Sequence, residues 1–115
     1  MLEERIKEAY CGCQQFSVAE LTCIALCDEI ATQEAIQEDR VLAVVLSPAL
    51  HDQLKQDASG GMFFSFQGRG IEHFAGLPVH VSFTLSADHG ALVYKREIHF
   101  FGLPLLHQVA FKERL

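Results

Sequence analysis

The segment Val41-Leu42-Ala43-Val44-Val45-Leu46 constrains the fold more than any other part of the sequence. It contains no polar residue and is rich in β-branched side chains. A run of this length and composition predicts a β-strand that is covered on both faces. Ser47 and Pro48 follow it directly, and these residues are favoured at the N-cap and the first position of a helix. We therefore expect a buried strand followed by a helix that ends at Gly60-Gly61.

Two helices are expected before this strand. Residues 2–14 carry apolar side chains at helical spacing, with acidic residues mostly elsewhere. Ser17-Val18-Ala19-Glu20 fits a capping box, in which the Ser17 hydroxyl accepts from the Glu20 N–H and the Glu20 carboxylate accepts from the Ser17 N–H. The next residues are apolar nearly all round up to Cys27, which is typical of a buried helix, and we expect this helix to end near residue 37.

The rest of the chain carries mostly strand patterns. Apolar or alternating segments predict strands at 62–66, 71–74, 78–85, 91–94, 98–101 and 105–111. Because short turns separate them, we expect an antiparallel sheet in which 78–85 pairs with 91–94 as a hairpin. The sequence predicts one α+β domain over residues 1–115, with N-terminal helices packed on one face of a mainly antiparallel sheet built from the C-terminal half. Its parts are a helical region 2–37, a strand–helix unit 41–59 and a β-rich region 62–111.

A seven-residue pattern occurs twice in the β-rich region. His73–Val79 and His99–Leu105 have the same residue at five of their seven positions. Each copy combines a strand with a glycine, which adopts positive φ readily, and a proline, which cannot donate to a strand ladder. We expect both copies to form the same bend in an edge strand.

The charge pattern excludes some classes of partner. The net charge is −6, and residues 1–58 hold 11 acidic and 4 basic residues. The longest basic run is only Lys95-Arg96, so no nucleic-acid partner is expected. No apolar run is long enough for a membrane span, and the acidic N-terminus lacks the apolar core of a signal peptide. We therefore expect a cytoplasmic protein with no membrane partner.

The four cysteines are Cys11, Cys13, Cys23 and Cys27. Without an export signal, free thiols are expected rather than disulfides. The spacing between Cys11 and Cys13 is too short for a zinc knuckle, and Cys23 and Cys27 lie in an apolar segment, which favours burial in the core. A structural metal site and a thiol-based regulator using Cys11 and Cys13 remain as alternatives.

The histidines of the β-rich region, His73, His80, His99 and His107, are the candidate metal or ligand residues. Histidine is the commonest metal ligand and titrates near neutral pH. No two of them have an HxH or HxxxH spacing, and no nucleophile or phosphate-binding motif is present. We therefore expect no cofactor and no catalytic residues, and small metal or ligand binding is the alternative function.

An exposed apolar surface is the remaining functional signal. The last third of the chain is rich in large apolar side chains, and a small domain need not cover them all. The alternative is that the acidic helix expected at residues 2–14 covers this surface within one chain. This pattern predicts a non-enzymatic structural or protein-interaction module that binds another protein or a second copy of itself. The candidate interface residues are Phe100, Phe101, Leu103, Leu105 and Leu106.

One stretch resembles a known family. The residues that carry the resemblance are Val44–Leu50, Leu54, Gly60-Gly61, Phe74–Ser82 and Ala91–Tyr94. In this order they resemble part of the major capsid proteins of tailed bacteriophages, over about residues 41–95. The chain is much shorter than those proteins and has no room for their long helix and extended arm. The resemblance implies a structural role in a phage- or prophage-derived protein, without catalytic residues.

Overall fold

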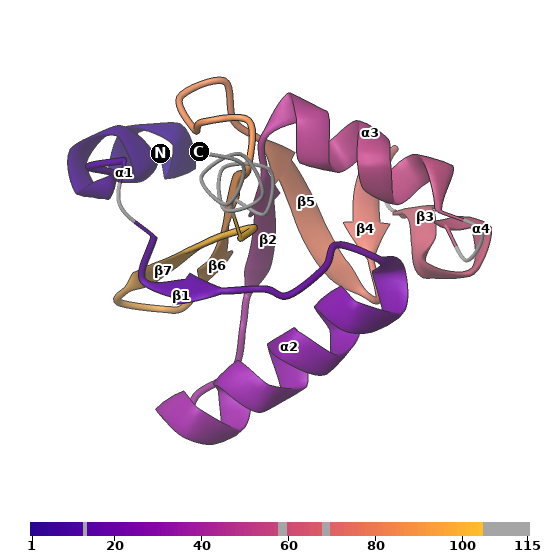
Figure 1. Cartoon of the computed structure of the whole chain (residues 1–115), viewed down its shortest axis with the longest axis horizontal. Coiled ribbons are helices and arrows are strands. Elements are labelled where there is room, and N and C mark those ends of the chain that lie inside the picture. The colour runs from indigo at the N-terminus through magenta and orange to yellow at the C-terminus, as the bar shows by residue number, and fades with distance from the viewer. Residues whose placement is uncertain (13, 58–59, 68–69, 105–115) are drawn as a thin grey trace, which may run out of the picture.

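The structure is a computed structural model that describes the chain except for residues 13, 58–59, 68–69 and 105–115. One mixed sheet has the strand order β1-β7-β6-β2-β5-β4-β3 and is accompanied by helices α1 to α4 (Figure 1). The bounds are α1 Leu2–Ala9, β1 Phe16–Ser17, α2 Cys23–Gln37, β2 Ala43–Leu46, α3 Pro48–Gln56, α4 Gly60–Phe63, β3 Phe64–Gln67, β4 Ile71–Phe74, β5 Leu77–Val81, β6 His89–Val93 and β7 Ile98–Gly102. Two strand pairs, β1–β7 and β2–β5, are parallel, and the other four are antiparallel. The predicted α+β class, with N-terminal helices and a mostly antiparallel sheet built largely from C-terminal strands, is confirmed.

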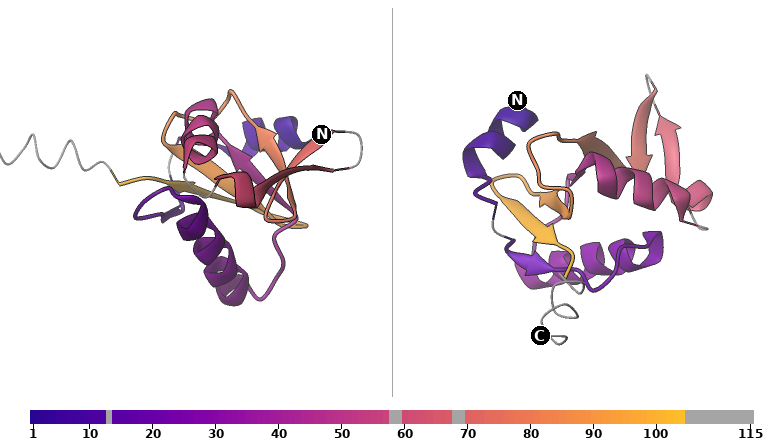
Figure 2. Two further views of the ribbon diagram at one scale, coloured as in Figure 1. Left: turned by 90° about the vertical axis from the view of Figure 1, so that its right-hand side faces the viewer. Right: turned by 45° about the horizontal axis from the view of Figure 1, so that its top comes forward.

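Strand β2 lies at the centre of the sheet and is buried on both faces, as its composition predicts. Val44 and Leu46 belong to one core cluster, which includes residues of α2 and α3, and we call it the α2-side core. Val45 points the other way and packs with Ile6 of α1 in a second cluster, the α1-side core. Figure 2 shows α1 and α2 on opposite sides of β6 and β7. The expectation that helices cover only one face is therefore wrong, because a strand of this kind needs cover on both.

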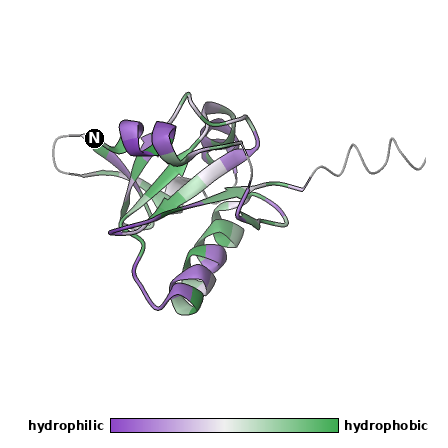
Figure 3. Cartoon of the chain, turned by 90° about the vertical axis from the view of Figure 1, so that its left-hand side faces the viewer, coloured by the Kyte–Doolittle hydropathy of each residue, from purple (hydrophilic) through white to green (hydrophobic). Residues whose placement is uncertain are grey.

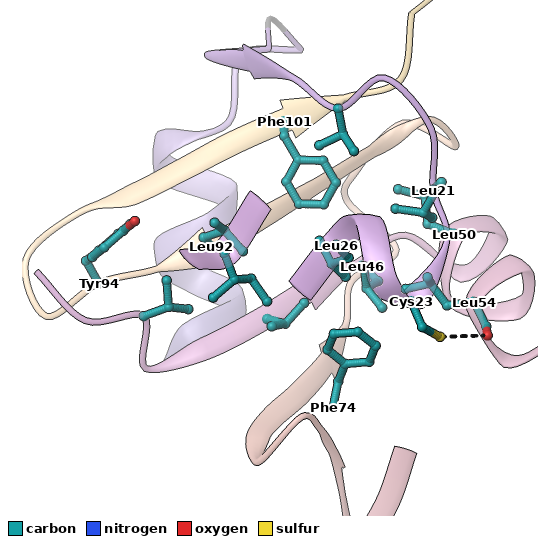
Figure 4. Packing of buried hydrophobic residues seen from close by; sticks show 14 residues of the cluster. Leu21, Cys23, Leu26, Leu46, Leu50, Leu54, Phe74, Leu92, Tyr94 and Phe101 are labelled. Atoms are coloured by element: carbon teal, nitrogen blue, oxygen red, sulfur yellow. Dashed lines mark hydrogen bonds between the residues drawn. The ribbon is translucent and has the colours of Figure 1, made fainter. Parts of the chain in front are cut away.

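The α2-side core is the larger cluster and is shown in Figure 4. Leu26 of α2, Leu54 of α3 and Leu92 of β6 are all fully buried in it. Helix α2 contributes only one face, since Ile24 and Ile36 are exposed. Figure 3 accordingly shows hydrophobic and hydrophilic residues alternating along α2. The apolar segment of α2 thus belongs to a surface helix rather than to a central buried one.

The predicted hairpin between residues 78–85 and 91–94 is not present. Strand β5 ends at Val81, and β2 lies between β5 and β6, pairing with both. After β5, the Ser82 N–H donates to the carbonyl group of Leu46 at the end of β2. The chain then leaves the sheet, and Phe83 is exposed. The fully apolar β2 takes the central position because it buries more apolar surface there than a half-polar strand would.

The N-terminal helices are shorter than predicted. Helix α1 ends at Ala9 instead of residue 14, and Gly12 adopts a φ of +84°. The capping box is also wrong, because Ser17 lies in β1, paired in parallel with β7. The Val18 N–H donates to the Gly102 carbonyl group, so sheet pairing replaces the local cap. Helix α2 begins five residues further on, where the Thr22 hydroxyl accepts from the Ala25 N–H.

The predicted start of α3 is confirmed. Ser47 is the N-cap, its hydroxyl accepts from the Leu50 N–H at 3.2 Å, and Pro48 is the first helical residue. The helix ends at Gln56, before the predicted Gly60-Gly61, which begin the short helix α4. Asp57 follows α3 and accepts from the Cys23 N–H at 2.8 Å, so the end of α3 stabilises the start of α2.

The two copies of the seven-residue pattern adopt different structures. In the first copy, Ala75 and Gly76 form the two-residue turn between β4 and β5, with φ of +50° and +86°. Two successive positive φ values are typical of a type I′ hairpin turn. In the second copy, Gly102 is the last residue of β7 and pairs with Ser17. Neither copy lies at a sheet edge, so the expectation of a shared edge bend is wrong.

Candidate functional site

The structure does not bring the candidate histidines together. His80 lies on the α1 side, with its Nε2 2.7 Å from Glu3 Oε1, whereas His99 contacts Tyr94 of the α2-side core. The His73 Nδ1 lies 2.9 Å from the carbonyl oxygen of Ile71 two residues before it. Within the described residues, no three or more His, Cys, Asp or Glu side chains form a group that could hold a metal ion. His107 lies outside the described residues.

The cysteines whose positions are described are free thiols. Cys11 is exposed, whereas Cys23 is fully buried and its Sγ lies 3.5 Å from the Leu54 carbonyl oxygen (Figure 4). Burial, together with the nearby Asp57, raises the pKa of the Cys23 thiol to about 12. Cys23 is therefore a protonated core residue and not a reactive thiol. Cys13 lies outside the described residues, so the proposed regulatory pair with Cys11 stays a prediction.

Two of the three candidate interface residues that the structure describes are interior. Phe100 is buried in the α1-side core and Phe101 in the α2-side core, so neither ring is available to a partner in the folded chain. Leu103 is half-buried against the α2-side core. The expectation of exposed aromatic residues here is wrong, because both faces of β7 are covered, one by the core that includes α1 and the other by the core that includes α2. Leu105 and Leu106, and the strand predicted for 105–111, lie outside the described residues.

A hydrogen-bonded carboxylate fixes α1 to the sheet. Glu3 accepts from the Thr84 hydroxyl at 2.6 Å and the Ser82 hydroxyl at 3.0 Å, in addition to its contact with His80. The bond from Thr84 lowers the pKa of Glu3 most, and the bonds from His80 and Ser82 lower it further, against the opposing effect of burial. This cluster explains why the polar residue Ser82 is fully buried. Its role is structural, since every one of its polar side chains is bonded to Glu3.

The low pKa of Glu3 leads to a prediction about acid stability. A carboxylate whose pKa is lower in the folded state contributes stability above its unfolded pKa and loses it as the pH falls through the folded value. Glu3→Gln is therefore expected to cost about 1 kcal/mol near neutral pH, allowing for partial solvent exposure. That difference should shrink at an acidic pH below the folded-state pKa of Glu3, as measured by urea unfolding of both proteins at that pH and at neutral pH.

Glu8→Gln is the matched control, because Glu8 lies on the same helix, is exposed and has no hydrogen bond to a described residue. It is expected to leave the stability nearly unchanged at both pH values. A cost of Glu3→Gln that is the same at low and neutral pH would contradict this account of Glu3.

A second polar cluster joins the end of α1 to the loop before β6. The Tyr10 hydroxyl lies 2.6 Å from His89 Nδ1 and 2.9 Å from Ser86 Oγ, and it also accepts from the Ser86 N–H. His89 borders a cavity of about 520 Å³ between this loop and Gly12. Tyr10 stands between Ser86 and His89, so these two do not form a direct nucleophile–base pair. The cluster therefore holds Tyr10, the residue that follows α1, against the loop before β6.

A further cavity lies between the end of α2 and the turn that joins β6 to β7. Its volume is about 410 Å³, and it is lined by Gln37, Asp39, Tyr94–Glu97 and His99. Tyr94 is almost fully buried, and its hydroxyl has no hydrogen-bond partner among the described residues. Sequence reasoning considered His99 but missed Tyr94. The available signal was a tyrosine at the end of an otherwise apolar strand, followed directly by the basic pair Lys95-Arg96.

Within the described residues, strand β3 forms one edge of the sheet and pairs only with β4. Phe66 in β3 is 68% exposed, and Met62, just before the strand, is 86% exposed. Phe64 instead points inward and contacts Phe74, with ring centroids 5.1 Å apart. The Lys55 ammonium group lies 5.5 Å from the centre of the Phe66 ring. The edge therefore combines a strand that has one described neighbour with exposed apolar side chains.

Comparisons with known proteins give no family assignment. No protein-family model matches the chain, and no curated protein or solved structure is significantly similar to it. None of the helices in the described residues is long and apolar enough to span a bilayer.

Proposed function

We propose that this chain is a non-enzymatic structural or protein-interaction module that self-associates through the β3 edge of its sheet. The observation that carries the proposal is that β3 is the last strand of the sheet within the described residues, with Phe66 of β3 and Met62 of α4 exposed beside it. Unpaired strand edges bind other strands through backbone hydrogen bonds, and exposed side chains add apolar contacts. Two copies related by a two-fold axis would pair their β3 strands antiparallel and extend the sheet.

The composition of β3 supports this use of the edge. Edge strands of monomeric proteins are commonly protected by charged residues, proline or bulges. The four residues Phe64–Gln67 contain no charged residue and no proline, and β3 keeps regular register with β4. The opposite edge, β1, is only two residues long and offers little to a partner. Of the two edges, β3 is therefore the one suited to strand addition.

Two further features agree with a structural role inside the cell. The free thiols Cys11, Cys23 and Cys27 fit a reducing compartment such as the cytoplasm. Most of the residues that resemble phage capsid proteins lie in β2, α3, β5 and β6, and three of these elements are neighbouring strands at the centre of the sheet. The proposal therefore includes a cytoplasmic location and a phage or prophage origin.

The substitution Phe66→Lys tests the proposal. It places a charge on the edge and removes an apolar contact, so the oligomer is expected to dissociate with at least a tenfold weaker association. The measurement is molar mass by size-exclusion chromatography with light scattering across a concentration series. The wild-type protein is expected to form a discrete oligomer and the variant a monomer at the same concentrations.

Phe83→Lys is the matched control, because Phe83 is 86% exposed and lies in the loop after β5, away from β3. It is expected to leave the oligomer intact. A wild-type chain that stays monomeric at every concentration would refute self-association. Equal dissociation by both variants would show that the interface is not at β3.

A further inference from the structure

The Lys55 side chain of α3 lies over the aromatic face of the β3 edge. Its ammonium group is 5.1 Å from the centre of the Phe64 ring and 5.5 Å from the centre of the Phe66 ring. The Glu72 carboxylate of β4 holds it there, with Oε2 2.6 Å from Lys55 Nζ. Phe66 and Glu72 are paired across the two strands, so both lie on the same face of the sheet as Phe64. At this edge, the positive charge of Lys55 is thus neutralised by Glu72.

Glu72 is well suited to neutralise Lys55. Its side chain is only 14% exposed, and its other oxygen, Oε1, lies 2.5 Å from His51 Nε2. Burial alone would raise the pKa of Glu72, but the hydrogen bonds from Lys55 and His51 outweigh that effect and lower it. The carboxylate is therefore ionised at neutral pH and is held between two residues of α3.

Self-association through β3 would bring the rings of a second copy against Lys55. In an antiparallel pair related by a two-fold axis perpendicular to the sheet, each face of one copy continues into the same face of the other. Side chains directly opposite each other then have Cβ atoms about 4.5–5.5 Å apart. When the two β3 strands overlap at Phe64–Phe66, a phenylalanine of the second copy lies opposite Phe66 and beside the Lys55 ammonium group. The Lys55 side chain, 38% exposed in one copy, is thereby covered.

A charge that an interface covers must be neutralised. Removing one member of a covered ion pair leaves an uncompensated charge and is costly, whereas replacing both members by uncharged residues is often neutral. We infer that Glu72 sets the strength of self-association by neutralising Lys55 as the second copy covers it. This inference rests on the proposed function, because it concerns the same edge. The neutral pair also favours a second copy over a strongly charged partner, since two equal edges can meet without like-charge repulsion.

The test is molar mass by light scattering across a concentration series, with urea unfolding to confirm that each variant is folded. Glu72→Gln keeps the shape of the side chain and removes its charge, so association is expected to weaken about tenfold. The double variant Glu72→Gln/Lys55→Met also removes the ammonium group and keeps an apolar side chain over the rings. It is expected to associate about as tightly as the wild-type chain. Glu8→Gln makes the same chemical change on α1 and is expected to leave association unchanged.

Rescue by Lys55→Met separates charge neutralisation from a structural role of Glu72, because a fold weakened by Glu72→Gln would not recover when Lys55 changes too. Should Glu72→Gln not fold, Lys55→Met alone is the test: it is expected to associate at least as tightly as the wild-type chain, and association about tenfold weaker would overturn the inference.

The failure of this inference is distinguishable from the failure of the proposed function. If Phe66→Lys dissociates the oligomer but Glu72→Gln associates like the wild-type chain, or is not rescued by Lys55→Met, the inference is overturned and self-association stands. A wild-type chain that is monomeric at every concentration would overturn both.

Discussion

Replacing Gly90 by alanine is expected to destabilise the folded chain by about 3 kcal/mol. Gly90 is a buried residue of β6, which lies between β2 and β7. A Cβ atom at this position would lie 2.5 Å from Cζ of Phe101 and 2.9 Å from the carbonyl oxygen of Val45. The Phe101 ring is fully buried and the carbonyl group belongs to the neighbouring strand, so neither can move away without disturbing the sheet.

Urea unfolding of Gly90→Ala and Gly61→Ala measures this effect against a matched control. Gly61 lies in α4, and a Cβ there would meet no atom within 4 Å. Gly61→Ala is therefore expected to be neutral or to stabilise the chain by up to about 1 kcal/mol, because alanine favours helices. If both variants unfolded at the same urea concentration as the wild-type protein, the packing of Phe101 against β6 would be wrong.

The central strand and the helix after it could be predicted because their signals are local. The segment 41–46 contains no polar residue, which already requires cover on both faces. Ser47-Pro48 fixes the start of α3 through residues adjacent in the chain. These two features were sufficient for the α+β class. They did not fix the strand order, because that depends on which segments compete for the positions beside β2.

The errors at the N-terminus and in the sheet have a common physical cause. Ser17-Val18-Ala19-Glu20 fits a helix cap, but pairing with β7 satisfies the same backbone groups. The Phe16 ring also packs on Phe101, with centroids 5.5 Å apart. At Ser17, these contacts with β7, which are distant in sequence, outweigh a local capping preference of about 1 kcal/mol. In the sheet, the pairing of β2 with both β5 and β6 likewise replaces the expected local hairpin. Local pattern analysis cannot detect such competition.

The candidate sites were predicted less well than the fold. The histidines were selected for their chemistry, yet alternation along the strands places His80 and His99 on opposite faces of the sheet. Conversely, Tyr94 resembled an ordinary strand residue. Its significance appears only when burial and hydrogen bonding are known, because an unpaired hydroxyl depends on what the whole fold places around it.

Replacing Phe74 by alanine is expected to destabilise the chain by about 3–5 kcal/mol. Phe74 of β4 is fully buried, and its ring stacks on Phe63 of α4 with centroids 5.7 Å apart and meets Phe64 of β3 edge-on. Phe64 in turn contacts His51 of α3. Removing the ring leaves a cavity where α4 and the β3–β4 hairpin join the core, so this part of the sheet is expected to loosen first.

Urea unfolding combined with amide hydrogen exchange tests this expectation. Phe83→Ala is the matched control, because it deletes the same side chain at an exposed position and should cost less than about 1 kcal/mol. In Phe74→Ala, protection is expected to fall more in β3 and β4 than in β6. Since β3 is the proposed association edge, Phe74→Ala should also weaken self-association, whereas Phe66→Lys should weaken it with little loss of stability. A Phe74→Ala chain that retained both full stability and full protection in β3 would show that Phe74 does not hold this edge in place.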